Sequence, residues 1–444
     1  MHQVCSPNPD NFIACPDCDL LVAKINPPAG YKSQCPRCGH ILLHHCRDTV
    51  SRSLALAVAG LLLFLPAIFM PLLTFQRLGM SETGNIIQTV VKFFDQGYSF
   101  VALAVFLSTA IFPLLKLSLL AFVSLCLKIQ RYPVWLGKLF RLHNHLDEWT
   151  MVEVYLLGIM VTIIKMYGST DIHFNTGAFC FTGLVVLIMA SSLSVCRESF
   201  WILIEGRGKH SFQMLHADNR PLQEAGTAAA NGLLLCRECG KLSSTCMDVH
   251  EEKEWRCRRC SAHLHFRKPA SLPRTWALVI SAAILMLPAY LLPIMRVDFL
   301  GIPRHSTILD GIKIFFQDGS YAIALIILTA SVFIPVFKVV GLAIGLLTIN
   351  LSRPRFLRQK TAMFRFIGFI GKWSMLDIFV IALLAFFINF GFLTSIETAP
   401  AATYFCLVVI TTMLAALTFD PRLMWDQLNA RTERSENTTH PGEQ

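Results

Sequence analysis

Long apolar runs alternate with shorter polar segments along the whole chain. Eight runs reach the length of about 20 residues that a membrane-spanning helix needs, and we place them at residues 53–75, 98–127, 149–167, 177–196, 275–296, 320–349, 373–391 and 400–419. Runs of this length and polarity predict transmembrane helices. We therefore expect an all-α polytopic membrane protein.

The second half of the chain repeats the first. An offset of 222 residues superposes Cys35, Pro66, Pro71, Gly97, Pro113 and Lys116 on Cys257, Pro288, Pro293, Gly319, Pro335 and Lys338. The offset is 221 for Cys15 and Cys236, and 224 for the pairs Trp149 and Trp373, Glu153 and Asp377, and Trp201 and Trp425. Because each copy has an even number of spans, both copies enter the membrane in the same direction. We expect two parallel repeats of four transmembrane helices.

Eight of the 15 cysteines form paired C-x2-C turns. The two sets are Cys15, Cys18, Cys35 and Cys38, and Cys236, Cys239, Cys257 and Cys260. Two such turns complete a tetrahedral site of four thiolates, which predicts a structural zinc ribbon with no open ligand position. Iron fits the same geometry and is the less favoured metal. Disulfides are disfavoured because we expect these segments to face the reducing cytoplasm.

These features divide the chain into five segments. Residues 1–52 form an N-terminal zinc ribbon, and 53–204 form the first four-helix membrane module. Residues 205–274 hold a linker and the second zinc ribbon, 275–425 form the second four-helix module, and 426–444 form a polar C-terminal tail. We expect both ribbons and the tail on the cytoplasmic side.

Composition and charge support this organisation. Hydrophobic residues make up 54% of the chain, charged residues 15%, and the mean hydropathy is +0.53, which leaves too little polar surface for a soluble multidomain protein. Of the 39 basic residues, 31 lie in segments on the side of the N-terminus and five on the opposite side. This bias predicts cytoplasmic termini and accounts for most of the net charge of +10 without nucleic-acid binding. The polar first 52 residues predict no cleavable signal peptide.

The segments outside the membrane are short. Apolar residues at helical spacing in 86–94 and 308–316 predict two amphipathic helices lying at the outer surface. The remaining outer loops, 168–176 and 392–399, are too short for a domain. Two prolines in each first span predict a kink or an unwound turn near the outer end of that helix.

A lysine stands deep in one apolar run of each half. A charge at that depth costs about 3 kcal/mol or more, so a partner or a function is expected to offset it. In the second half we expect Lys338 to meet Asp377 of the following span, with hydroxyls from Ser331, Thr411 and Thr412, as a polar site for a lipid headgroup or a proton.

Two structural alternatives apply to these charges. In the first half, Lys116 and Glu153 occupy the equivalent positions, and we expect them to form a structural ion pair. A purely structural pair that fixes helix register is the alternative for Lys338 and Asp377 as well.

Several motifs resemble one known family. They are Leu-Pro-Ala-x-x-x-Pro (287–293), Asp-Gly-Ser-Tyr (318–321), Pro-Val-Phe-Lys (335–338), Gly-Lys-Trp-Ser-Met-Leu-Asp-Ile-Phe-Val (371–380) and Thr-Phe-Asp-Pro-Arg-Leu-x-Trp (418–425). Together with the doubled ribbon, they are similar to the paraquat-inducible protein A family of Gram-negative inner-membrane proteins. The resemblance implies a non-enzymatic component of intermembrane lipid transport that serves envelope integrity. It also implies a phospholipid or another lipid as cargo and a periplasmic MCE-domain protein as partner.

Two other functions remain open. One is a membrane redox protein with iron in the four-cysteine sites. The other is a scaffold that anchors the MCE-domain partner without moving lipid. A phosphate-binding GxxxxGK[ST] motif does not occur in the sequence, so ATP is not the evident energy source.

Overall fold

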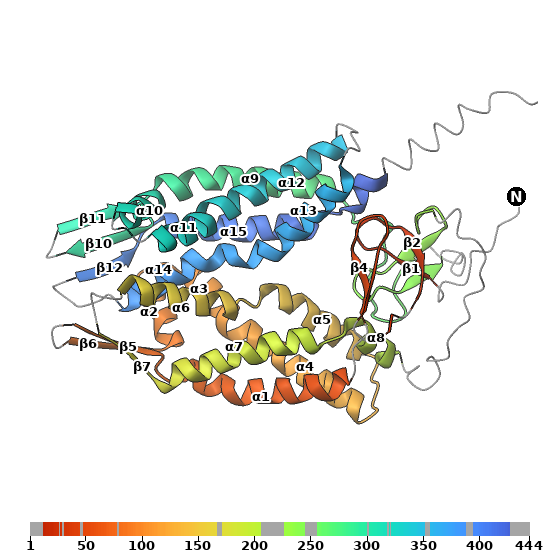
Figure 1. The fold of residues 1–444 in the computed structure, drawn as a ribbon, viewed down its shortest axis with the longest axis horizontal. Coiled ribbons are helices and arrows are strands. Elements are labelled where there is room, and N and C mark those ends of the chain that lie inside the picture. The colour runs from red at the N-terminus through yellow and green to blue at the C-terminus, as the bar shows by residue number, and fades with distance from the viewer. Residues whose placement is uncertain are drawn as a thin grey trace, which may run out of the picture.

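The computed structural model describes residues 12–25, 27–28, 31–44, 48–77, 80–166, 171–205, 226–244, 255–299, 302–317, 319, 321–350, 356–387 and 394–426. These residues form an elongated helical bundle with the cysteine ribbons at one end and two small sheets at the other (Figure 1). Most of the predicted C-terminal tail and residues 206–225 of the predicted linker lie outside the described residues.

Each half of the chain contributes its own set of helices. The first set is α1 (Thr49–Phe69), α2 (Ile86–Asp95), α3 (Ser99–Phe106), α4 (Phe112–Lys128), α5 (Leu136–Trp149), α6 (Val152–Met166), α7 (Thr176–Ser194) and α8 (Arg197–Ile204). The second set is α9 (Ser271–Leu291), α10 (Ile308–Gln317), α11 (Tyr321–Leu328), α12 (Ile334–Asn350), α13 (Leu357–Ile370), α14 (Leu376–Phe387) and α15 (Ala401–Thr418). The two amphipathic stretches expected at the outer surface are helices α2 and α10.

The described residues contain six single helices that are long and apolar enough to cross a membrane. They are α1, α3 with α4, α7, α9, α11 with α12, and α15. A seventh span is possible if α13 and α14 count together, although they are bent by 42° at the break between them. Six to seven apolar helices among the described residues leave the predicted repeat of four spans in each half a prediction. A break lies just before the third apolar run of each half, and the described part of α6 has 15 residues.

A π-helical turn lies at the same place in both repeats. It covers Leu107–Ile111 between α3 and α4, and Thr329–Phe333 between α11 and α12. A proline follows each turn at the second position, and proline cannot donate to the carbonyl four residues before it. In the second half this carbonyl belongs to Ser331, and the hydroxyl of Tyr290 donates to it at 2.8 Å. The widened turn thus accommodates the proline, and a side chain replaces the missing donor.

The outer segments, expected to be loops, form two equivalent three-stranded antiparallel sheets. The first has the order β6-β5-β7, from β5 (Leu73–Arg77), β6 (Met80–Gly84) and β7 (Asp171–Phe174). The second has the order β11-β10-β12, from β10 (Met295–Phe299), β11 (Ile302–Ser306) and β12 (Thr394–Thr398). In each half, the hairpin after the first span pairs with the strand before the last span. The sheets therefore tie the outer ends of these spans together.

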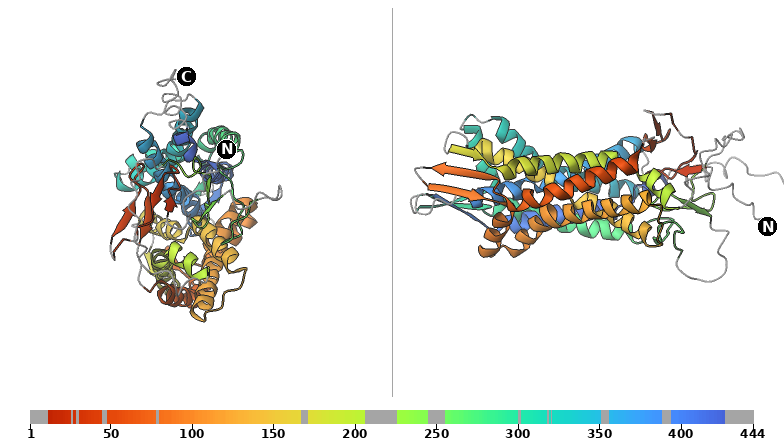
Figure 2. Two further views of the ribbon diagram at one scale, coloured as in Figure 1. Left: turned by 90° about the vertical axis from the view of Figure 1, so that its right-hand side faces the viewer. Right: turned by 90° about the horizontal axis from the view of Figure 1, so that it is seen from below.

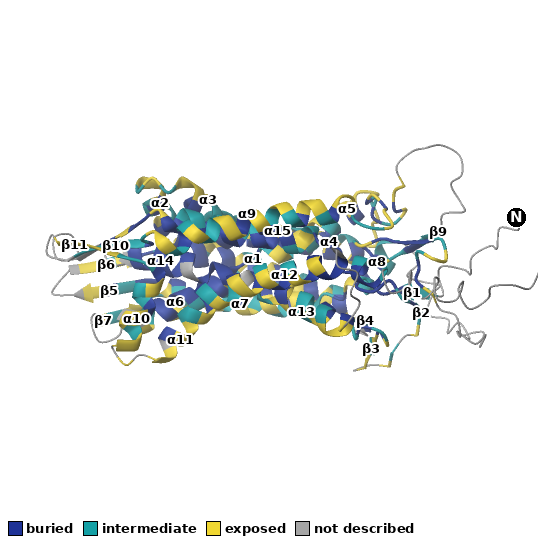
Figure 3. Cartoon of the chain, turned by 90° about the horizontal axis from the view of Figure 1, so that it is seen from above, coloured by how far each residue is buried: buried dark blue, intermediate teal, exposed yellow. Residues whose placement is uncertain are grey.

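The two halves meet along α6 and α14 in the outer part of the bundle. Tyr155 on α6 packs edge-on against Phe379 on α14, with ring centroids 5.3 Å apart. A Cβ atom at Gly158 would lie 3.2 Å from the Cβ atom of Phe379, so the helices approach closely there. The Gln96 side chain, after α2, accepts hydrogen bonds from the backbone amide and the hydroxyl of Thr398 at 3.3 and 2.9 Å. Buried side chains from both halves form one continuous core (Figure 3).

Each cysteine ribbon packs against the opposite half of the chain. The first ribbon contains β1 (Phe12–Ala14) paired with β2 (Leu21–Ala23), and β3 (Lys32–Gln34) paired with β4 (Ile41–His44). Its cysteines share a core with Leu342, Leu346, Phe419 and Trp425 of the second half. The second ribbon contains β8 (Leu233–Leu235) paired with β9 (Leu242–Ser244). Its cysteines share a core with Leu136, Phe140, Phe200 and Trp201 of the first half. Both ribbons lie at the same end of the molecule (Figure 2).

One buried tryptophan lies beneath each ribbon. Trp425 donates a hydrogen bond to the Thr361 hydroxyl at 3.1 Å, and the guanidinium of Arg37 from the first ribbon lies 4.6 Å from its ring centroid. Trp201 occupies the equivalent position of the first half and packs edge-on against Phe140, with ring centroids 5.0 Å apart. We call this arrangement, in which each ribbon packs against the half of the chain that does not follow it directly in sequence, the crossed arrangement. Trp425 and Trp201 anchor it.

Replacing either tryptophan tests the crossed arrangement. Trp425→Ala should weaken docking of the N-terminal ribbon by about 3 kcal/mol, because a large buried side chain is lost. Limited proteolysis of the full chain should then cleave the N-terminal ribbon first.

The matched variant is Trp201→Ala, which should instead expose the second ribbon. If each variant releases the ribbon that precedes its own half in the sequence, the ribbons are not crossed.

Candidate functional site

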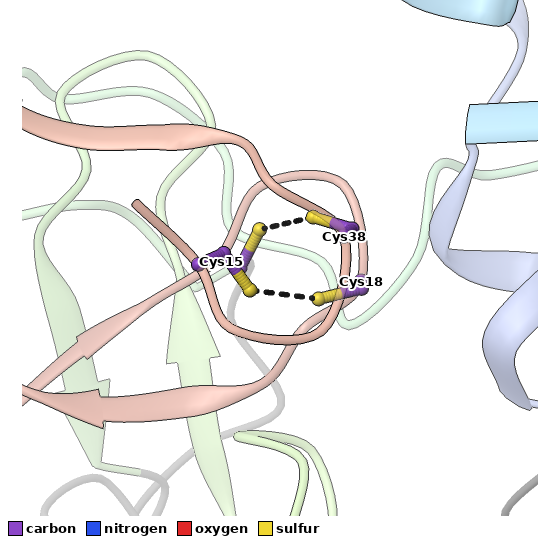
Figure 4. A group of neighbouring side chains, drawn as sticks. Cys15, Cys18 and Cys38 are labelled. Carbon is purple, nitrogen blue, oxygen red and sulfur yellow. Dashed lines mark hydrogen bonds between the residues drawn. The ribbon is translucent and has the colours of Figure 1, made fainter. Parts of the chain in front are cut away.

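The first cysteine set forms a compact buried cluster. The Sγ atoms of Cys15 and Cys38 lie 3.4 Å apart, and those of Cys18 and Cys35 lie 3.5 Å apart. One sulfur from each of the four residues lies within 4.8 Å of all the others. Figure 4 shows the thiols of Cys15, Cys18 and Cys38 pointing toward a common centre. The two C-x2-C turns therefore converge as the spacing predicts.

The second set repeats this geometry. The sulfurs of Cys236 and Cys260, and those of Cys239 and Cys257, lie 3.5 Å apart. Tetrahedral zinc with a zinc–sulfur distance of about 2.3 Å needs sulfurs about 3.8 Å apart. All eight residues are buried free cysteines, so each cluster can accept a metal ion with little movement. A metal ion held by all four sulfurs of a cluster would have no open ligand position, which is typical of structural sites.

Metal analysis tests these clusters. Cys18→Ser should lower the bound metal of the purified chain from two equivalents to one, because the two clusters do not share ligands. It should also destabilise the first ribbon, whose small core depends on the metal.

The control is Cys406→Ser, which removes a buried thiol of α15 outside both clusters and should keep both equivalents. Two equivalents in the Cys18 variant would contradict the assignment.

Lys338 on α12 is fully buried inside the second half. Its ammonium donates hydrogen bonds to the Gly371 carbonyl at 3.3 Å, the Ser374 hydroxyl at 3.1 Å and the Thr412 hydroxyl at 3.2 Å. Gly371 and Ser374 lie in the 3-10 turn Gly371–Met375 that separates α13 from α14. The 3-10 turn at the start of the third run thus supplies a carbonyl oxygen and a hydroxyl to the lysine. Among the described side chains, the partners of Lys338 are all neutral oxygens.

Lys116 has a different environment in the first half. Its ammonium donates to the Asp147 carboxylate at 2.5 Å and to the Ser192 hydroxyl at 2.8 Å. Glu153 is the acid expected from the sequence, and the structure places Asp147, at the end of α5, against the lysine. The 224-residue offset aligns Asp147 with Gly371, so the carboxylate of the first half is replaced by a backbone carbonyl in the second. The two lysines are therefore chemically different.

The other predicted residues of the second half lie at varying distances from this cluster. Thr412 joins it, whereas the Thr411 hydroxyl donates to the carbonyls of its own helix at Leu407 and Val408. The Ser331 hydroxyl donates to the Ile327 carbonyl at 2.6 Å, because the π-helical turn changes the register between Ser331 and Lys338. The side chain of Asp377 lies outside the described residues, so its predicted pairing with Lys338 stays a prediction.

Sequence reasoning missed Asp147, Ser192, Gly371 and Ser374. A signal existed for the two acceptors of the second half, because both belong to the Gly-Lys-Trp-Ser motif that precedes Asp377. Asp147 lacked such a signal, since its position before the third run suggested a residue outside the membrane.

An ion-pair network connects the ribbons to the end of the last span. Asp420 is fully buried, pairs with Arg422 at 3.1 Å and with Arg237 of the second ribbon at 3.1 Å. Burial acts to raise the pKa of Asp420, but the charges of these two arginines, together with hydrogen bonds from Arg422 and from the Lys268 backbone amide, lower it to about 2. Arg267 joins Asp19 of the first ribbon at 3.0 Å. The Asp-Pro-Arg segment therefore acts as the meeting point of both ribbons.

Comparison with known proteins gives a family. A model described as paraquat-inducible protein A matches residues 50–205 and 272–429. The chain belongs to the paraquat-inducible protein A family. The two matched regions coincide with the two helix sets, which agrees with the duplication. The chain is a multi-pass membrane protein of this family.

Curated relatives of this family are similar along nearly the whole chain. The intermembrane transport protein PqiA of Escherichia coli (strain K12) is 31% identical over 94% of this chain and 95% of its own. The lipophilic envelope-spanning tunnel protein A of the same strain is 30% identical over 94% and 91%. A probable intermembrane transport protein of Haemophilus influenzae is 27% identical over 94% and 96%. No solved structure matches the chain.

Proposed function

We propose that this protein moves lipid between bacterial membranes as the inner-membrane component of a transport system. It would pass lipid to or from a periplasmic MCE-domain tunnel protein and thereby maintain the envelope. Both termini face the cytoplasm in this proposal, in agreement with the distribution of basic residues. The names of the relatives support transport, and the name of one relative refers to an envelope-spanning tunnel.

The neutral environment of Lys338 is the observation that carries the proposed site. Among the described residues, the Lys338 ammonium is held by hydroxyl and carbonyl oxygens, which do not neutralise its charge. A lipid phosphate could accept hydrogen bonds from it, or the amine could exchange a proton during a transport cycle. Asp377 is proposed as the second charged group, and Thr412 as the hydroxyl that orients the lysine. Lys116 instead has a permanent carboxylate partner and is assigned a structural role.

The outer sheets are the proposed contact with the MCE-domain protein. They lie at the end of the bundle opposite the ribbons (Figure 1) and project beyond the spanning helices. The ribbons are proposed to hold zinc as structural ions, since their four ligands leave no position for a substrate. This role requires no covalent chemistry and no bound nucleic acid.

Replacing Lys338 and Lys116 in separate variants distinguishes the proposed transport site from the structural ion pair of the first half. Lys338→Met should reduce lipid transfer to background, because the ammonium is lost while a side chain of similar length fills its space. Its stability should change by less than about 1 kcal/mol, since an apolar replacement for a buried charge is often neutral. The measurement is transfer of a fluorescent phospholipid from proteoliposomes that contain the full chain and its MCE-domain partner.

Lys116→Met is the matched control. It removes the buried ammonium beside Asp147, whose carboxylate keeps its contacts with Arg197 and Ser192. Stability should therefore fall by less than about 3 kcal/mol, while transfer continues in the molecules that remain folded. Normal transfer by the folded Lys338 variant would refute the site. Loss of partner binding in that variant, with no separate effect on transfer, would instead support the scaffold function.

A further inference from the structure

A cavity of about 630 Å³ lies at the ribbon end of the molecule, apart from the Lys338 cluster. Its walls come from α5, from the second ribbon and from the Asp-Pro-Arg segment after α15. This volume falls within the range of about 300–1,000 Å³ that is typical of small-molecule sites. Nothing in the transport role described above uses this cavity.

The lining of the cavity is strongly basic. It contains five lysine and arginine side chains and three histidines, but Glu238 is its one acidic residue. Glu238 accepts a hydrogen bond from His145 at 3.2 Å, and this bond lowers the pKa of the Glu238 carboxyl. The acid is therefore already paired within the wall.

Three of the basic side chains in the lining are bound to other parts of the protein. Arg237 and Arg422 share the buried carboxylate of Asp420, and the Lys268 ammonium donates to the Phe419 carbonyl at 3.2 Å. Because these groups are fixed by their partners, they form a rigid floor beneath the cavity.

Two further basic side chains of the lining, on α5, are not held in an ion pair among the described residues. Lys138 is exposed and Arg141 is half-buried, and both line the cavity from one face of the helix. Within the described part of the chain, neither of them forms an ion pair with a carboxylate. In the described structure, Lys138 and Arg141 therefore add positive charge to the cavity wall that is not held in an ion pair.

The apolar residues next to these basic side chains fit a phospholipid better than a free anion. Leu139, Leu142 and Pro269 line the same cavity, so an apolar wall adjoins the charges. Trp135 lies one residue before α5 and is 47% exposed. An exposed tryptophan beside the ends of spanning helices is typical of the membrane–water boundary. The cavity thus opens where lipid headgroups lie.

We propose that this cavity binds the phosphate of an anionic phospholipid headgroup, with Lys138 and Arg141 as the phosphate ligands. The leucines and Pro269 would contact the glycerol and the first acyl carbons. A bound lipid would join α5 of the first half to the second ribbon, because both elements contribute to the cavity wall. This site is distinct from the Lys338 cluster and does not require that the protein moves lipid.

Binding of dioctanoyl-phosphatidylglycerol to the purified full chain tests the proposal. The double variant Lys138→Glu with Arg141→Glu should bind this lipid at least about tenfold more weakly, since each basic group near a membrane contributes about 1 kcal/mol. The milder Lys138→Gln with Arg141→Gln should show an intermediate loss. An unchanged melting temperature would confirm that both variants fold.

The matched control is Lys128→Glu with Arg131→Glu. It reverses two exposed charges at the C-terminal end of α4, at the ribbon end of the molecule but outside the cavity. It should bind the lipid as the unmodified chain does. Equal weakening in both double variants would overturn the site in favour of a diffuse surface charge.

Two further probes separate the lipid from its components. Inorganic phosphate at the concentration of the lipid should not displace it, and dioctanoylglycerol, which lacks the phosphate, should not bind. Displacement by free phosphate would show a soluble anion as the occupant, and equal binding of dioctanoylglycerol would show an apolar pocket; either result overturns the proposal. Because no transfer is measured, this outcome is independent of the transport role.

Discussion

A buried ammonium in a membrane-length helix needs polar partners, and this requirement explains several features of the fold. In each half, the buried lysine of the second span is held by polar groups at the junction that precedes the third apolar run. The 3-10 turn gives the second lysine the Gly371 carbonyl, and the last turn of α5 gives the first lysine the Asp147 carboxylate. This junction therefore supplies polar partners to both lysines.

The two repeats hold their buried lysines with different partners. The offset that aligns the helices also aligns a carboxylate in one half with a glycine in the other, so Lys116 has a carboxylate partner, whereas the described partners of Lys338 are neutral oxygens. In the proposed function, the first half is therefore a structural support and the second half carries the working charge. The ribbons join the halves at one end of the bundle, and the α6–α14 contact joins them nearer the end that carries the sheets (Figure 1).

Local spacing explains which features were predictable from the sequence. The two metal clusters depend on C-x2-C turns, whose geometry is set within a few residues, and they were placed correctly. The lysines were conspicuous because charge is rare in apolar runs. The two sheets were not predictable, because β7 and β12 are short and pair with strands about a hundred residues away in the chain. Three-dimensional packing alone determines which ribbon covers which half, so the contact of Arg37 with Trp425 had no sequence signal.

The distinction between the two lysines leads to one direct measurement. A Cβ atom at Gly371 would lie 4.0 Å from the Cε atom of Lys338, and the backbone there is helical, so an aspartate fits this position. Gly371→Asp would give the second half the ion pair of the first. We expect this variant to keep or gain thermal stability and to lose lipid transfer in proteoliposomes. Transfer at the unmodified rate by a folded Gly371→Asp protein would contradict the role of an unneutralised Lys338.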